Sequence, residues 1–162
     1  MATAISETDA DIPFLLHQCW SPLVMTSYAN LYVAVLIAVT PDVTGNRFLE
    51  IAYTRSINLR AFKQATLKSI TYEIYSSPSG EPKSDSSIGA VARLAGYEAT
   101  FGTASRYHIH IKGLVTMIRQ RGGLESLGFD GLLMRMIQII DIVSAYILGC
   151  KTYFQTMGPV AG

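Results

Sequence analysis

Two histidines in the second half of the chain are the first residues that could take part in metal chemistry. His108 and His110 are two positions apart, which separates them by about 200° around a helix, so one helix face cannot offer both to the same ion. The third histidine, His17, is far away in the sequence. We therefore predict no metal and no cofactor, and we expect His108 and His110 to lie on the surface or to pack between helices.

One acidic residue, Asp141, stands inside a largely apolar run at 136–147. A buried carboxylate is costly unless it is paired or hydrogen-bonded. We predict a structural role in which Asp141 pairs with a guanidinium across the junction of two helices, with Arg121 and Arg135 as the candidates. No base, nucleophile or metal-ligand cluster accompanies it, so we do not predict a catalytic carboxylate.

The glycines and cysteines also lack the context of a reactive site. Gly122 and Gly123 could belong to a phosphate-binding loop, but no strand precedes them and no Lys-Ser or Lys-Thr pair follows. We predict instead that they end a helix whose last turn contains Arg121. Cys19 and Cys150, the only cysteines, are expected to be free thiols in a reducing compartment, with a single disulfide as the alternative. We predict that the protein is not an enzyme.

Composition indicates a globular domain with an apolar surface. Of the 162 residues, 49% are hydrophobic and only 15% are charged, and the net charge is +1. Ordinary proteins have ~25% charged residues, so these values exclude a disordered tail and a highly charged coiled coil. The near-neutral charge argues against direct nucleic-acid binding by this chain. Too few charges remain to cover the surface, and we expect an apolar patch that binds a partner.

The first part of the chain combines an acidic start with a very apolar segment. Residues 1–13 contain three acidic and no basic residues, so they lack the features of a targeting signal; we expect them to be disordered and the chain to be intracellular. The segment 23–39 predicts a helix that is buried all round. It is shorter than the about 20 residues that a membrane span needs, but a membrane span and a buried strand remain as alternatives.

The remaining pattern predicts an all-α fold, an antiparallel array of about five to six paired helices. The helical domain spans 14–155, and 156–162 are expected to be disordered. Ile70 to Tyr75 leave a short strand as an alternative. Asp85 or Ser84 is expected to cap the third helix, Ser105 the fourth and Asp130 the fifth. Besides 23–39, the expected elements are a helix at 47–75, a mobile polar loop at 76–87, and helices at 86–101, 105–121 and 131–149.

Four stretches together are similar to one family. These are 84–102, 110–117, 121–135, and Asp141 followed by Tyr153-Phe154. They resemble the helical regulatory region of fungal-specific transcription factors, and the resemblance covers about residues 19–154. Its most specific part is Arg-Gly-Gly-Leu at 121–124, followed by Leu-Gly-x-x-Gly-Leu-Leu at 127–133.

The resemblance implies a nuclear, non-enzymatic regulatory module that acts through protein contacts, linked to metabolic or secondary-metabolite gene control. The family's zinc cluster needs six cysteines and this chain has two, so we expect a truncated relative without the DNA-binding element. The expected partner is a second copy or a full-length relative, bound by exposed faces of the first and last helices, 23–39 and 131–149. No small-molecule ligand can be inferred. The alternatives are a small membrane-associated protein anchored by 23–39 and a non-functional truncated fragment.

Overall fold

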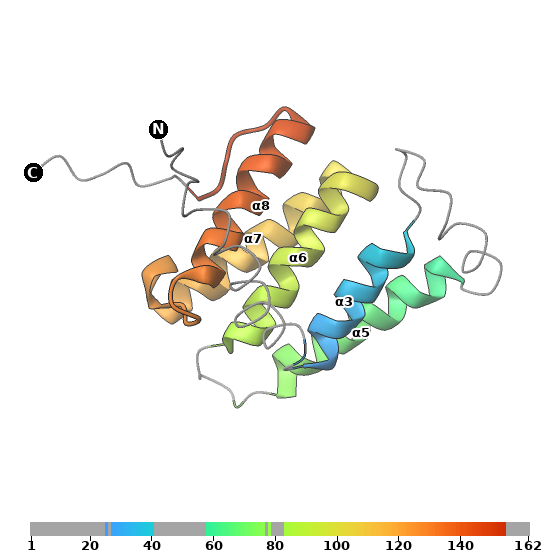
Figure 1. Cartoon of the computed structure of the whole chain (residues 1–162), viewed down its shortest axis with the longest axis horizontal. Coiled ribbons are helices and arrows are strands. Elements are labelled where there is room, and N and C mark those ends of the chain that lie inside the picture. Colours follow the sequence, from blue (N-terminus) through green and yellow to red (C-terminus); the bar gives the residue numbers. More distant parts are fainter. Residues whose placement is uncertain (1–24, 26, 41–57, 77, 79–82, 155–162) are drawn as a thin grey trace, which may run out of the picture.

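The computed structural model describes residues 25, 27–40, 58–76, 78 and 83–154, and this part of the chain is all-α, as predicted. The predicted disordered ends, 1–13 and 156–162, lie outside the described residues, as do all of 41–57 and with them the start of the helix predicted at 47–75. The helices, arranged as in Figure 1, are α3 (Tyr28–Val39), α5 (Leu59–Ser76), α6 (Asp85–Phe101), α7 (Ala104–Arg121) and α8 (Leu132–Leu148), with a short 3-10 helix η2 (Leu124–Ser126) before α8.

Helix α6 lies at the centre of the fold. It contacts α3 and α5 on one side and α7 and α8 on the other, and 12 of its 17 residues are buried. Many of these are as small as Gly89, Ala92 and Ala95, which lets the neighbouring helices approach the α6 backbone closely.

The prediction that 23–39 is buried all round is wrong for the described part of this segment. In α3 only Ala29, Asn30, Val33 and Leu36 are buried, whereas Tyr28 is 79% exposed. Its large apolar side chains lie on both faces of the helix, and the neighbours α5 and α6 cover only one of these faces. The helix that is buried nearly all round is α6.

Several element boundaries follow from local chemistry. Of the two residues predicted to cap α6, Ser84 does so, since its hydroxyl accepts the backbone N–H of Ser87, whereas Asp85 is the first residue of the helix. The predicted Ser105 cap of α7 is wrong, because the side chain of Thr103 accepts the N–H of Arg106 instead. Helix α5 continues through 70–75, which removes the strand alternative there. The loop between α5 and α6 is shorter than the predicted 76–87, since both of its ends are helical.

The predicted cap at Asp130 is also wrong. Gly131 occupies the N-cap position of α8, without a side-chain hydrogen bond. Asp130 is exposed and has a φ of 52°, and Phe129 before it has a φ of 61°. A side chain caps a helix from an extended backbone, so the left-handed turn at 129–131 keeps Asp130 from that role.

Gly122 ends α7 as predicted, and this generates the first testable prediction. Its φ is 101°, in the left-handed region where a Cβ is strained. Gly122→Ala should lower the free energy of unfolding by about 1 kcal/mol. The matched variant is Gly113→Ala inside α7, where an added Cβ has open space. It should raise that free energy by roughly 0.5–1 kcal/mol. Chemical denaturation measures both, and equal effects of the two variants would contradict this account.

Candidate functional site: an apolar groove over the central helix

Asp141 attaches the chain after α8 to the body of the protein. Its side chain is fully buried, with Oδ1 accepting the backbone N–H of Tyr153 at 3.0 Å and Oδ2 that of Phe154 at 2.7 Å. The hydroxyl of Tyr107 on α7 donates to Oδ1 at 3.3 Å. Burial, together with the charge of Asp141, raises the pKa of Tyr107 above its usual value, so this hydroxyl stays protonated at neutral pH.

The arginine partner predicted for Asp141 is wrong. Arg121 pairs instead with Asp85 at the start of α6, with 2.8 Å between Nη2 and Oδ1, and Arg135 is exposed. The other oxygen of Asp85 accepts the backbone N–H of Gly128 at 3.1 Å. Two backbone N–H groups and one hydroxyl therefore meet the need of the buried Asp141 carboxylate, which charge-assisted hydrogen bonds can do without a guanidinium.

A groove runs over α6 between α3 and α8. Its volume is about 420 Å³, within the usual range of binding pockets. Its lining is mostly apolar, with α6 as the floor and the other two helices as the sides. The lining residues are Ala34 and Ile37 from α3; Arg93, Gly96, Tyr97, Thr100 and Phe101 from α6; and Ile139, Ile140, Val143 and Ser144 from α8.

Both sides of the groove are fixed to its floor. Near one end of α3, the side chain of Asn30 donates to the backbone carbonyl of Ser86 at 2.8 Å. At the other end, the hydroxyl of Thr40 is hydrogen-bonded to the hydroxyl of Tyr97 at 3.1 Å. On the opposite side, a Cβ placed on Gly96 would lie 3.2 Å from Cγ2 of Ile140, so α8 packs tightly on α6 at this point.

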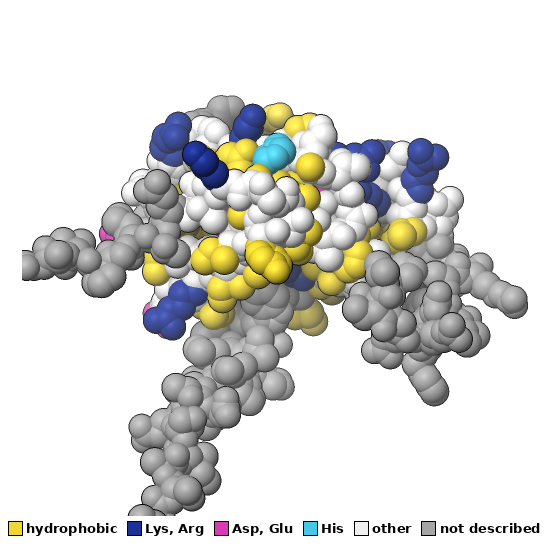
Figure 2. Space-filling model, turned by 90° about the horizontal axis from the view of Figure 1, so that it is seen from above, with side chains coloured by type: hydrophobic (Ala, Val, Ile, Leu, Met, Phe, Trp, Pro, Cys, Tyr) yellow, Lys and Arg dark blue, Asp and Glu magenta, His cyan; other side chains and the backbone are white. Residues whose placement is uncertain are grey.

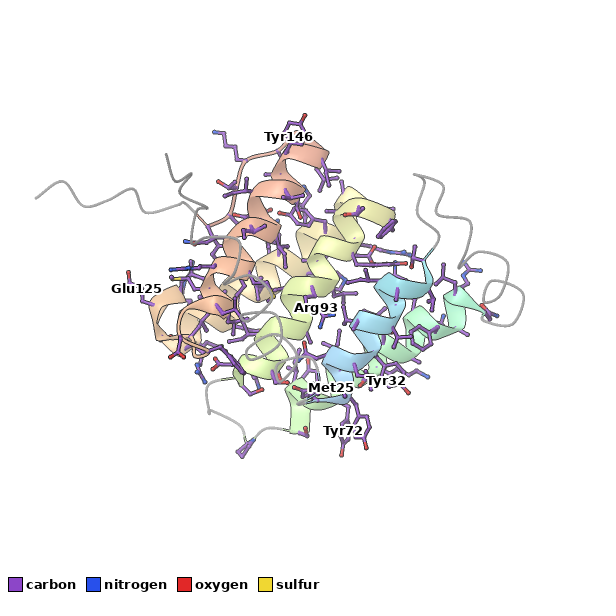
Figure 3. The ribbon with its side chains drawn as sticks, viewed as in Figure 1. Met25, Tyr32, Tyr72, Arg93, Glu125 and Tyr146 are labelled. Carbon is purple, nitrogen blue, oxygen red and sulfur yellow. The ribbon has the colours of Figure 1, made fainter. Side chains whose placement is uncertain are left out.

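Arg93 contributes a positive charge to the floor. It is only 6% exposed, and its Nη1 donates to the backbone carbonyl of Asn30 at 3.3 Å. Figure 3 shows it between α6 and α3. Burial lowers the pKa of Arg93 to about 10, so the guanidinium is still charged at neutral pH.

The sides of the groove continue into exposed apolar surface. On α8, Ile139 is 61% exposed and Tyr146 is 88% exposed, and Tyr146 points away from the other helices in Figure 3. In Figure 2 hydrophobic side chains gather across the middle and lower part of the face, with Lys and Arg mainly toward its edges. Apolar patches of this kind on a folded protein usually mark a contact surface. The other exposed residues of this group are Ile37 on α3 and Ile142, Val143 and Ile147 on α8.

Charged side chains are missing from the exposed faces of α3 and α8. Helix α3 contains no charged residue, and after Arg135 the only charged residue of α8 is the buried Asp141. A solvated helix face normally carries charged side chains. The exposed faces of α3 and α8 were the predicted contact surfaces, but the groove between them was not predicted.

A second polar cluster lies between α5 and α6. Nζ of Lys63 is 2.6 Å from Oε1 of Glu98, which is fully buried, and it lies 5.2 Å from the centre of the Tyr97 ring. The ion pair joins α5 to α6. We assign this cluster to packing of α5 on α6.

The histidines lie in different surroundings. Nδ1 of His108 is 2.8 Å from the hydroxyl of Tyr153. For His110, the charges of Glu98 and Lys63 both act on the pKa of the ring. Among the described residues, no group of three or more His, Cys, Asp or Glu could hold a metal ion. Cys150 carries a free, half-buried thiol, while Cys19 lies outside the described residues.

Comparison with known proteins gives no family for this chain. No protein-family model matches it, and neither does a curated protein or a solved structure. The resemblance to fungal-specific transcription factors therefore stays a prediction. Within the described ranges, no helix has the length and apolar character needed to cross a membrane.

The hydrogen bonds of Asp141 generate a prediction about stability. Asp141→Asn places an N–H₂ group opposite one of the two backbone N–H donors and removes the charge, which should cost about 3 kcal/mol in the free energy of unfolding. Tyr107→Phe removes a single long hydrogen bond and should cost about 1 kcal/mol or less. Denaturant titration of both variants measures the difference, and equal losses would show that the backbone donors do not depend on the carboxylate.

His110 generates a prediction about pH. Its pKa is lowered from the usual 6.5 mainly by burial, and further by Lys63 and Arg106, with Glu98 acting in the opposite direction. Below the usual pKa the unfolded chain therefore binds the proton more readily, and stability should fall as the pH drops from about 7 to about 5. His110→Gln should make this fall shallower while leaving the slope above about pH 8 unchanged. Identical slopes in the acidic range would contradict the burial of His110.

Proposed function

We propose that the chain is a non-enzymatic regulatory module that acts through protein contacts made at the groove and its sides. It resembles the regulatory region of fungal-specific transcription factors, and a role in metabolic or secondary-metabolite gene control in the nucleus follows from that resemblance. The proposed partner is a second copy or a full-length relative. This chain would contribute no DNA-binding element of its own.

The observation that carries the proposal is the uncharged apolar surface around the groove. Exposed Ile and Tyr side chains there have no structural role in the described part of the fold, and hiding them from water is favourable by about 25 cal/mol for each Å². An amphipathic helix of a partner fits such a groove by placing its apolar face against α6. The volume of about 420 Å³ leaves room for its side chains.

The polar residues in the stretches that carry the family resemblance, here called the motif residues, support the proposal because they stabilise the packing of the helices. Arg121 and Asp85 join the end of α7 to the start of α6, and Asp141 holds the chain after α8. These polar contacts join α6 and α8, which form the floor and one side of the groove, to α7. In this proposal the motif residues are structural, and the contact residues are the apolar ones on α3, α6 and α8.

A reporter assay tests the proposed function. The full chain is fused to an unrelated DNA-binding domain in fungal cells, and output is measured from a promoter that carries its operator. The fusion should change output several-fold relative to the DNA-binding domain alone. Ile139→Asp places a carboxylate in the groove and should return output to that baseline, because a partner would have to bury the charge.

Ile109→Asp is the matched control for this experiment. Ile109 is 66% exposed on α7, close to the 61% of Ile139, and it does not line the groove. This variant should keep the full effect. A fusion that leaves output at the baseline would refute the regulatory role, and equal output from the two variants would refute the role of the groove.

A further inference from the structure

The groove and the exposed part of α8 belong to one face of the molecule. Ile139 and Val143 line the groove from α8, and Ile142 and Tyr146 continue the same helix outside it. One surface therefore carries both a hollow and an apolar ridge beside it. A surface with both parts can bind a copy of itself about a two-fold axis, because each ridge then enters the hollow of the other copy.

The charge distribution is compatible with a copy of the same chain as the partner. In a two-fold contact every charge near the axis meets its own equivalent, and like charges repel at close distance. The exposed parts of α3 and α8 around the groove carry no charge, so these two helices, among the described residues, bring no like charges together. Arg93 is already buried on the floor, and covering the groove removes little further water from it. The net charge of +1 adds almost no long-range repulsion between two molecules.

We infer that a second copy of this chain occupies the groove. The α8 ridge of each copy lies on α6 of the other, between its α3 and α8, so that the two α8 helices pack side by side. Tyr146 and Ile142 supply the ridge, and Ile37, Ile139 and Val143 supply the sides of the hollow. The contact is closed by symmetry, so assembly stops at two copies. This inference rests on the proposed contact role of the groove and names its partner.

Sedimentation equilibrium of the full chain over a range of concentrations tests the inference. The unaltered chain should pass from monomer to dimer in the micromolar range and form no larger species. Ile139→Asp should weaken dimerisation at least about tenfold, since two-fold symmetry brings the new carboxylate into the contact twice. Ile109→Asp should leave the dimerisation constant unchanged.

Folding is checked separately, by circular dichroism and thermal melting of each variant. Both isoleucines are more than half exposed, so both variants should keep the helical signal and melt as the unaltered chain does. This check makes any loss of the dimer attributable to the contact itself.

Each other outcome overturns the inference in a different way. A chain that stays monomeric at high micromolar concentration would show that two copies do not bind each other, and would overturn the inference. A dimer that resists Ile139→Asp, or that is weakened equally by Ile109→Asp, uses another surface. Open-ended oligomers would show a head-to-tail contact in place of the two-fold one. A monomer that still changes reporter output refutes the second copy alone, whereas a dimer without reporter effect refutes the regulatory function alone.

Discussion

The small side chains of α6 are the constraint on which the rest of the structure depends. Gly89, Ala92 and Ala95 keep the outline of this helix narrow, so that α3, α5, α7 and α8 can all contact it. Where two of these four neighbours do not contact each other, a strip of the α6 surface between them stays open. The strip between α3 and α8 is the groove, and Gly96 sets how closely α8 approaches at its edge.

Polar contacts and apolar surface have separate tasks in this molecule. The buried carboxylate of Asp141 accepts hydrogen bonds from two backbone N–H groups and a hydroxyl. In the buried carboxylate of Glu98, Oε1 is paired with the ammonium group of Lys63, while Oε2 has no hydrogen-bond partner among the described residues. These carboxylates fix positions of helices and are not directed into the groove. The groove has the opposite character, with exposed isoleucines and few polar atoms. This separation is the basis of the contact role proposed for the surface.

Hydrophobic periodicity was sufficient to predict the all-α fold and the helices α6, α7 and α8 within a few residues. Local signals also predicted a cap at Asp85 or Ser84 and the left-handed Gly122, because these depend on neighbouring residues alone. The partner of Asp141 could not be predicted in this way. Its donors are backbone N–H groups 12 and 13 residues later, and any residue type can supply a backbone N–H.

The groove could not be predicted from the sequence either, because it depends on how distant helices are arranged. The absence of charge from α3 and from the end of α8 is visible in the sequence and indicates that the outer faces of both helices are apolar. Whether two such faces pack against each other or leave a groove between them depends on where each helix contacts α6, which the sequence pattern does not give. The apolar character of 23–39 suggested a helix buried on all sides, whereas α3 has an uncovered outer face with Tyr28 and Leu31.

The central claim is that molecules of this chain associate through the groove. Isoleucine methyl groups provide the most direct measurement, because the chain has isoleucines inside and outside it. In NMR spectra of methyl-labelled protein, the signals of Ile37, Ile139 and Ile140 should shift as the protein concentration rises, while that of Ile109 stays in place. Shifts confined to Ile109, or no concentration dependence at any of these methyl groups, would contradict the account.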